Sequence, residues 1–312
     1  MNKKTNKNQK FILAAIVVIA LAIAIYFIAT AIDGDKNTKK EKQQVSLMDK
    51  YGNEVTISQK PEKVICYSPE LAEILYAIGA GDTLIGRSEY CDYPEEITKV
   101  KAVGDILNIN LESVMEMKPD LVLLSSMASK ELVSSLNSKG ITALQLDADT
   151  SAEGVYTYIE AMGKIFDKEN KAEELIKSMK EDIEEIKNKT KSLDKPLVYF
   201  VVSAGEYDSG ATGDTFIGEL LELAGAENVA KDGTNWMYSI EKLLEKNPDI
   251  IICSKLYDTK KLIMQTEGYK DLEAVKNGKI IEVDENIFYR QGPRMTEAIL
   301  ELAKQFHPEA FN

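Results

Sequence analysis

Two stretches of this sequence are versions of one another, and they constrain its fold more than any other feature. In each, a glutamate stands seven residues before a Pro-Asp pair, and a short apolar run follows; the stretches are residues 110–124 and 239–253. The pattern predicts a short amphipathic helix, a stop enforced by proline, and a buried strand. Asn110 and Ser239 are suitable N-caps, which puts Glu112 and Glu241 in the first helical turn, where the helix dipole favours an acid. One copy alone would indicate only helix capping, whereas two matched copies indicate two related lobes, each presenting one carboxylate.

Short strands alternate with helices on both sides of a long helical region, which predicts an α/β fold with two doubly wound lobes. The expected lobes are residues 45–150 and 193–312. Between them, residues 151–192 contain no strand signal and show helical spacing of apolar residues, with a break at 167–170. We therefore expect a helical connector whose second helix is long and charged on its outer faces. An ordinary surface helix is the alternative for that segment.

The N-terminal region predicts a membrane segment. Four lysines lie within residues 1–10, and residues 11–32 are 22 residues without a charged side chain. Such a run is long enough to span a bilayer as a helix, and the preceding lysines place the N-terminus inside. We expect 1–32 to be a cytoplasmic tip with a transmembrane anchor, although a signal peptide cleaved after Ala29-Thr30-Ala31 fits as well. Residues 33–44 follow as a charged linker, so the rest of the chain is expected outside the membrane, either anchored or secreted.

Composition excludes several functional classes. A formal net charge of −13 argues against nucleic acid as a partner. The three cysteines are far apart in sequence and form no CxxC pair, so they predict neither a disulfide framework nor a zinc site. His307 is the only histidine, and no GxSxG or P-loop motif occurs. We therefore expect no catalytic residues, no metal site and no cofactor, and a protein that is not an enzyme.

The arginines give the sharpest indication of a binding site. Only three of the 38 basic residues are arginines, and all three directly follow expected strands. Ligands of doubly wound sheets bind at the carboxyl ends of strands, and arginine offers a bidentate donor fork that lysine lacks. Arg294 could instead pack at a helix start, Arg87 could pair with an acid, and any one aromatic could be a packing residue. The predicted ligand-binding residues are Arg87, Tyr90, Tyr207, Trp236, Tyr257, Tyr289 and Arg290.

Six sequence motifs, in order, resemble the periplasmic-binding-protein family for iron complexes and vitamin B12. They are residues 61–65, 68–80, 90–94, 118–122, 224–228, and 292–294 with a terminal His307-Pro308, and the resemblance covers roughly 45–311. Members of this family are solute receptors of ABC importers, with two α/β lobes joined by one long helix and the ligand between the lobes. The resemblance also implies that Glu112 and Glu241 dock onto arginines of the permease dimer, and that Trp236 faces the ligand.

The expected function is therefore capture of a bulky metal chelate outside the membrane and its delivery to an ABC importer. A ferric siderophore is the first expectation, because arginines suit an anionic chelate; a corrinoid such as cobalamin is second and haem third. The residue that would ligate haem iron is not assigned, although Tyr207 or Tyr257 could serve. The alternative from another class is a membrane-tethered sensor ectodomain or an enzyme of related architecture. The chain departs from secreted lipoproteins because no cysteine lies near the end of the apolar segment.

Overall fold

The computed structural model describes residues 44–146 and 150–312, and the larger of the chain's two units spans residues 45–312. The expected membrane helix at 11–32 and the linker at 33–43 lie outside the described residues. Within the described ranges, no helix is both long enough and apolar enough to cross a membrane.

The first part of the larger unit contains a parallel four-stranded sheet with strand order β4-β3-β5-β6. Every residue of β3 and β5 is buried, as expected for central strands covered on both faces. A separate antiparallel hairpin, β1–β2, precedes this sheet. The strands are β1 (Val45–Met48), β2 (Glu54–Ile57), β3 (Val64–Cys66), β4 (Leu84–Arg87), β5 (Leu121–Leu124) and β6 (Ala143–Gln145), and the α-helices are α2 (Pro69–Ala77), α3 (Leu111–Met117) and α4 (Lys130–Ser138).

The second part contains a five-stranded sheet in which β11, β10 and β7 are parallel neighbours and β8 is antiparallel to β7. Strands β8 and β9 are two residues each, too short to leave a periodic signal, and the sequence did not predict them. The strands are β7 (Leu197–Ser203), β8 (Ser209–Gly210), β9 (Glu227–Asn228), β10 (Ile250–Ser254) and β11 (Ile280–Val283), and the α-helices are α7 (Phe216–Leu223), α8 (Ile240–Lys246), α9 (Thr259–Gln265), α10 (Glu273–Lys276), α11 (Glu285–Tyr289) and α12 (Met295–Phe306).

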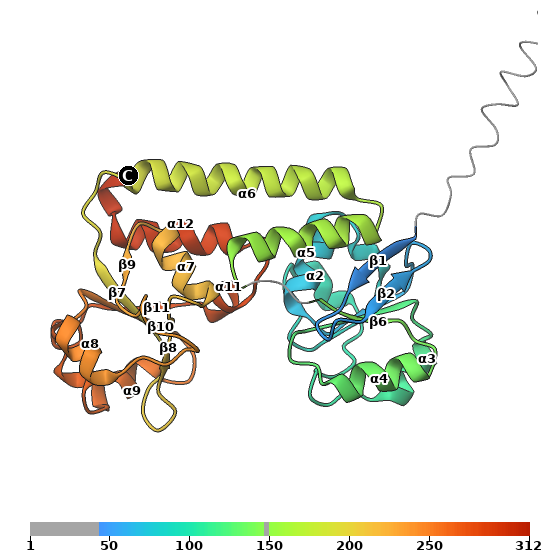
Figure 1. The fold of residues 1–312 in the computed structure, drawn as a ribbon, viewed down its shortest axis with the longest axis horizontal. Coiled ribbons are helices and arrows are strands. Elements are labelled where there is room, and N and C mark those ends of the chain that lie inside the picture. The colour runs from blue at the N-terminus through green and yellow to red at the C-terminus, as the bar shows by residue number, and fades with distance from the viewer. Residues whose placement is uncertain (1–43, 147–149) are drawn as a thin grey trace, which may run out of the picture. The chain divides into compact units, whose positions relative to one another are not determined.

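Helices α5 (Ala152–Ile165) and α6 (Glu169–Thr190) connect the two sheet-bearing parts, and both lie within the stretch where the sequence indicated helices. Asp167 lies between them with a φ of 53°, where the helical path breaks. One stripe of α6 is buried, and the helix packs against both α5 and α12 (Figure 1). A single hydrophobic core contains residues of α6 together with Val64 of the first sheet and Phe200 of the second. The connector is therefore part of the core, while the domain boundaries at 150 and 192 stay predictions.

Candidate functional site

A cavity of about 610 Å³ is lined by residues from both sheet-bearing parts and from the connector. Its polar lining includes both acidic and basic side chains, and four tyrosines also line it. The lining residues are Lys50, Tyr67, Pro69, Glu70, Ser88, Tyr90, Ile106, Ser125, Ser126, Met127, Thr150, Tyr158, Asn286, Tyr289, Arg290 and Gln291. Three of the predicted ligand-binding residues are among them: Tyr90, Tyr289 and Arg290.

The loop after β4 brings Tyr90 to this cavity. The Ser88 N–H donates to the Cys66 carbonyl in β3 at 2.8 Å, and the Cys91 N–H donates back to the Ser88 carbonyl at 3.1 Å. These two bonds turn the chain sharply, so that Tyr90 projects outward with 63% of its surface exposed. The pairing of β3 with β4 therefore positions the loop that carries Ser88 and Tyr90, two of the lining residues.

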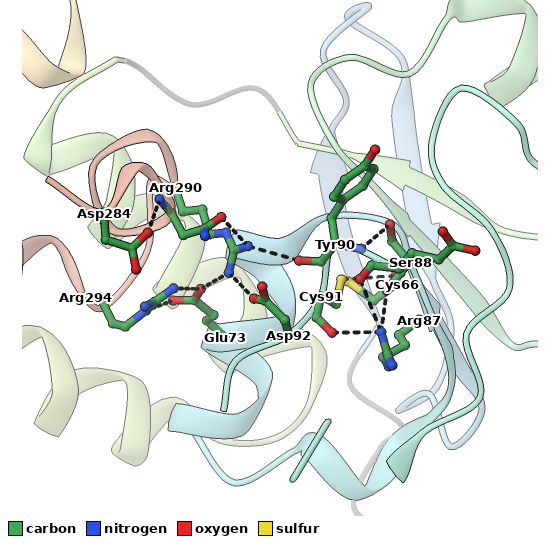
Figure 2. Close-up of polar contacts among 12 residues, drawn as sticks. Cys66, Glu73, Arg87, Ser88, Tyr90, Cys91, Asp92, Asp284, Arg290 and Arg294 are labelled. Carbon is green, nitrogen blue, oxygen red and sulfur yellow. Dashed lines mark hydrogen bonds and ion pairs between the residues drawn. The ribbon is translucent and has the colours of Figure 1, made fainter. Parts of the chain in front are cut away.

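Arg290 lies at the centre of a polar network that joins sequence-distant parts of the cavity wall (Figure 2). Its Nη1 is 3.0 Å from Glu73 Oε1 and 2.7 Å from Asp92 Oδ1. Its Nη2 donates to the Tyr90 carbonyl at 3.0 Å and to Asn286 Oδ1 at 2.9 Å. Burial acts to lower the pKa of the Arg290 guanidinium, but its bonds to the two carboxylates outweigh burial, and the pKa lies above its ordinary value. Arg290 is therefore charged, and its charge is balanced within the protein.

Arg294 shares the same buried carboxylate. Its Nε and Nη2 donate to the two oxygens of Glu73 at 2.9 and 2.6 Å, a bidentate pair. Its guanidinium also lies 4.1 Å from the centroid of the Tyr93 ring. The side chain of Glu73 is only 2% exposed, so it is a buried counter-ion for two arginines. This structural role for Arg294 is the alternative that the sequence had left open.

Glu70 and Lys50 complete the charged lining of the cavity. Burial raises the pKa of the Glu70 carboxyl, although hydrogen bonds to its own N–H and to Ser68 partly oppose this shift. Lys50 Nζ donates to the Ser126 carbonyl at 2.8 Å. The cavity therefore combines two basic groups with a carboxyl group, and Glu73 and Asp92 add negative charge directly behind Arg290.

Arg87, the other arginine predicted to bind the ligand, lies outside the cavity lining. Its guanidinium donates to the main-chain carbonyls of Val100, Ser88 and Cys91 at 3.2, 3.0 and 3.1 Å, and it does not line the cavity. The side chain thus holds the loop that carries Tyr90 and Asp92. Direct contact between Arg87 and a ligand stays a prediction, and this geometry does not favour it.

The remaining predicted ligand-binding aromatics lie on loops of the C-terminal sheet and outside the cavity lining. Tyr207 and Tyr257 are 79% and 85% exposed. Trp236 is half-buried, packs against the core, and donates its main-chain N–H to Thr212 Oγ1 at 3.2 Å. Exposed rings of this kind suit contact with a large ligand, but their roles stay predictions.

The two repeated stretches adopt the same local structure. Glu112 and Glu241 are exposed in the first turns of α3 and α8, behind the N-caps Asn110 and Ser239. Each helix ends at a residue with positive φ, Lys118 at 49° and Asn247 at 43°.

The aspartate of each Pro-Asp pair then ties its strand to the neighbouring one. Asp120 Oδ2 accepts from the Lys63 N–H at 2.9 Å, and Asp249 Oδ2 accepts from the Leu197 N–H at 2.8 Å. Both carboxylates therefore sit on helices that are anchored to equivalent central strands of two sheets. Their predicted role in docking stays a prediction.

Sequence reasoning did not identify Glu73, the buried partner of two arginines, or two of the tyrosines that line the cavity. Glu73 looked like an ordinary helical glutamate, because its partners follow more than 200 residues later in the chain. Tyr67 and Tyr158 fit the apolar spacing of a strand and a helix, so nothing distinguished them from core residues. In residues 44–146 and 150–312, no group of three or more histidine, cysteine, aspartate or glutamate side chains is placed to hold a metal ion.

Known proteins are similar to this chain in both sequence and fold. A family model described as periplasmic binding protein matches residues 64–287. The ABC transporter substrate-binding lipoprotein YvrC of Bacillus subtilis is 36% identical over 286 residues, covering 89% of this chain and 90% of the relative. A cobalamin-binding protein of Halobacterium salinarum is 27% identical over 81% of this chain and 71% of its own length. A vitamin B12-binding protein of Vibrio parahaemolyticus is 27% identical over 81% of this chain and 92% of its own.

Solved structures of similar fold belong to proteins of the same kind. A possible iron-binding, periplasmic solute-binding protein of Staphylococcus epidermidis superposes with a TM-score of 0.71 and 31% identity, over 79% of this chain and 98% of that one. The haem-binding protein RhuT of Roseiflexus has a TM-score of 0.71 at 19% identity, over 80% and 99% of the two chains. At that identity the likeness concerns the fold.

Proposed function

We propose that this chain, which belongs to the periplasmic binding protein family, captures a corrinoid outside the membrane and delivers it to an ABC importer. The general role follows from the family. The chain is an ABC transporter substrate-binding protein for ligands of the iron, haem or vitamin B12 type, and it is not an enzyme. The proposal adds the ligand, the docking residues and the mode of membrane attachment.

The charge balance of the cavity carries the choice of ligand. An anionic siderophore was the first expectation because the arginines seemed available to bind it. Arg290, however, is paired with Glu73 and Asp92, and Arg87 is bonded to carbonyls. Glu70 adds a carboxyl group to the lining. A corrinoid carries amide groups that donate and accept hydrogen bonds, and it suits a cavity whose charges are already compensated.

Two of the relatives support the choice of a corrinoid, because they are described as binding cobalamin or vitamin B12. A ferric siderophore is the second candidate, favoured by the possible iron-binding protein that is 31% identical. Haem is the third, because the haem-binding structures are too distant in sequence to support more than the fold.

Glu112 and Glu241 are the proposed contacts to the permease dimer. Both carboxylates are exposed, and both lie on short helices that are tied to central strands in the same way. Exposed carboxylates at fixed positions are suited to arginines of a partner, where they add specificity and speed association. The partner is therefore expected to present two basic sites.

We further propose that residues 11–32 attach the protein to the membrane. The Bacillus relative is described as a lipoprotein, but the first cysteine of this chain is Cys66, in β3. A lipid on a cysteine near the N-terminus is therefore not available, and the apolar run is the remaining candidate.

Titration calorimetry with the full-length protein in mild detergent tests the choice of ligand. Cyanocobalamin, a ferric catecholate, a ferric hydroxamate and hemin are titrated separately under the same conditions. We expect cyanocobalamin to bind most tightly. Tyr90→Ala and Tyr289→Ala should each weaken binding about 5- to 30-fold, as expected for aromatic contacts at the centre of a site. Met48→Ala, exposed and outside the cavity, should leave affinity unchanged.

Tighter binding of a ferric siderophore would make the second candidate the correct one. Absence of binding by all four ligands would overturn the metal-chelate proposal.

A further inference from the structure

Two cysteines that are far apart in sequence lie side by side in the core. Cys66 belongs to β3 and Cys91 to the loop after β4, and both are buried, with 0% and 1% of their surface exposed. The Cys91 Sγ lies 3.7 Å from the Cys66 carbonyl oxygen, and the two sulfur atoms lie next to one another in Figure 2. The turn made by Ser88 is what folds Cys91 back over β3.

Cys253 provides an internal contrast. It is buried in β10 of the other sheet and belongs to a different hydrophobic cluster from Cys66 and Cys91. All three thiols are free in this structure. Only Cys66 and Cys91 are therefore placed to react with one another.

We propose that Cys66 and Cys91 are a modification site at which an intramolecular disulfide forms outside the membrane. The oxidant is a disulfide-bearing molecule, such as a thiol–disulfide oxidoreductase or glutathione disulfide. One cysteine thiolate attacks the oxidant disulfide, forms a mixed disulfide and releases one thiol. The second cysteine then attacks the mixed disulfide and releases the other thiol. Two electrons and two protons pass to the oxidant, and one sulfur–sulfur bond joins Cys66 to Cys91.

The proposed location outside the membrane supplies the oxidising environment, so this inference uses that part of the proposed function. It does not depend on the ligand.

Burial determines when the reaction can occur. Burial, together with the neighbouring Cys91 thiol, raises the pKa of the Cys66 thiol well above its usual value. A buried thiol in its protonated form is a poor nucleophile and has little access to an oxidant. The bond is therefore expected to form while the chain folds or while the loop at 88–93 opens, and to resist reduction once the loop is closed.

The position of Cys91 links this bond to the ligand cavity. Tyr90, which lines the cavity, precedes it, and Asp92, which pairs with Arg290, follows it. A bond to β3 would hold both neighbours in place. We expect the oxidised protein to melt about 5–10 °C higher than the reduced one, because the cross-link restricts the unfolded chain.

The test uses the full-length protein in mild detergent. It is dialysed from urea into a buffer containing reduced and oxidised glutathione, alkylated, digested and analysed by mass spectrometry. We expect a linked peptide pair containing Cys66 and Cys91, alkylated Cys253, and two fewer titratable thiols. Cys253→Ala should form the same link and show the same rise in melting temperature. Cys91→Ser should show neither, and Cys66→Ala serves as a second variant.

Circular dichroism of each reduced variant checks that it has folded. Three free thiols after oxidative refolding, or a link that includes Cys253, would overturn the proposal. Because the readout is the state of the thiols, this result is independent of the ligand titrations.

Discussion

Glu73 and Arg290 are 217 residues apart in the sequence, yet Glu73 Oε1 lies 3.0 Å from Arg290 Nη1. Glu73 belongs to α2, beside the first sheet, whereas Arg290 follows α11, beside the second. Arg294 binds the same carboxylate. One buried acid thus links the two sheet-bearing parts through charged hydrogen bonds, in addition to the hydrophobic core that they share.

Replacing this acid should therefore destabilise the protein. Glu73→Gln keeps the side-chain volume but removes the counter-ion of Arg294 and leaves Arg290 with Asp92 alone, which costs about 3–5 kcal/mol of unfolding free energy. Urea unfolding followed by Trp236 fluorescence measures the loss. Glu174→Gln, in an exposed pair with Lys171, is the matched control and should hardly change stability. Equal stability of the two variants would contradict the role of Glu73.

Arg87→Ala should lower stability and leave ligand affinity unchanged. The guanidinium bonds to main-chain carbonyls of the loop, and the loss of hydrogen bonds from a charged group costs about 1.5–3 kcal/mol. Unfolding and ligand titration of the same preparation separate the two effects. A tenfold loss of affinity in a variant of normal stability would instead assign Arg87 to the ligand site.

Ligand transfer should depend on the two exposed glutamates. Glu112→Ala together with Glu241→Ala should leave ligand affinity unchanged and abolish uptake in cells, because both changes remove charges from the proposed docking surface. Glu116→Ala with Glu245→Ala removes two other exposed carboxylates from the same helices and is the matched control. Uptake at the normal rate in the first double variant, with expression verified, would rule out the docking role.

Stability should depend on pH through Glu70. Burial raises the pKa of this carboxyl in the folded state above its unfolded value of about 4.5. Its contribution is therefore most favourable below pH 4.5, where it is protonated in both states, and is lost as the pH rises through the folded pKa. Glu70→Gln should gain stability relative to the wild type as the pH rises above 4.5. Urea unfolding at several pH values measures this difference, with the surface variant Glu62→Gln as control; a difference independent of pH would contradict the prediction.

The mature protein should retain its N-terminal segment. The 22 uncharged residues at 11–32 suit a membrane helix, and no cysteine near them can carry a lipid. N-terminal sequencing of protein from washed membranes should begin within residues 1–10. A sequence that begins at Ile32 would show cleavage of a signal peptide.

Local sequence patterns predicted most of the fold, because the main helices and strands are marked by capping residues, prolines and the spacing of apolar residues. At the start of α2, for example, Ser68 is the N-cap, its Oγ accepts from the Leu71 N–H, and Pro69 follows at the first helical position. The two repeats indicated α3, α8 and the strands after them. The two-residue strands β8 and β9 were missed, because their pairing is imposed by β7.

The candidate site was less predictable. Residue type and position after a strand singled out Tyr90, Tyr289 and Arg290, which line the cavity, although their contact with a ligand stays a prediction. The same reasoning could not distinguish Arg87, whose partners are main-chain carbonyls that carry no sequence signal. It could not find Glu73 or the Cys66–Cys91 contact either, because both depend on how distant segments meet.

The shared core beneath α6 has a consequence for how this protein can evolve. Ile176 and Ile183 of α6 belong to the same hydrophobic cluster as Val64 and Phe200, so the two sheets are expected to unfold together rather than separately. A cavity opened under α6 would then reduce the population of molecules that can recognise either the ligand or the transporter. Natural selection for uptake therefore acts also on aliphatic residues of a helix that does not line the cavity.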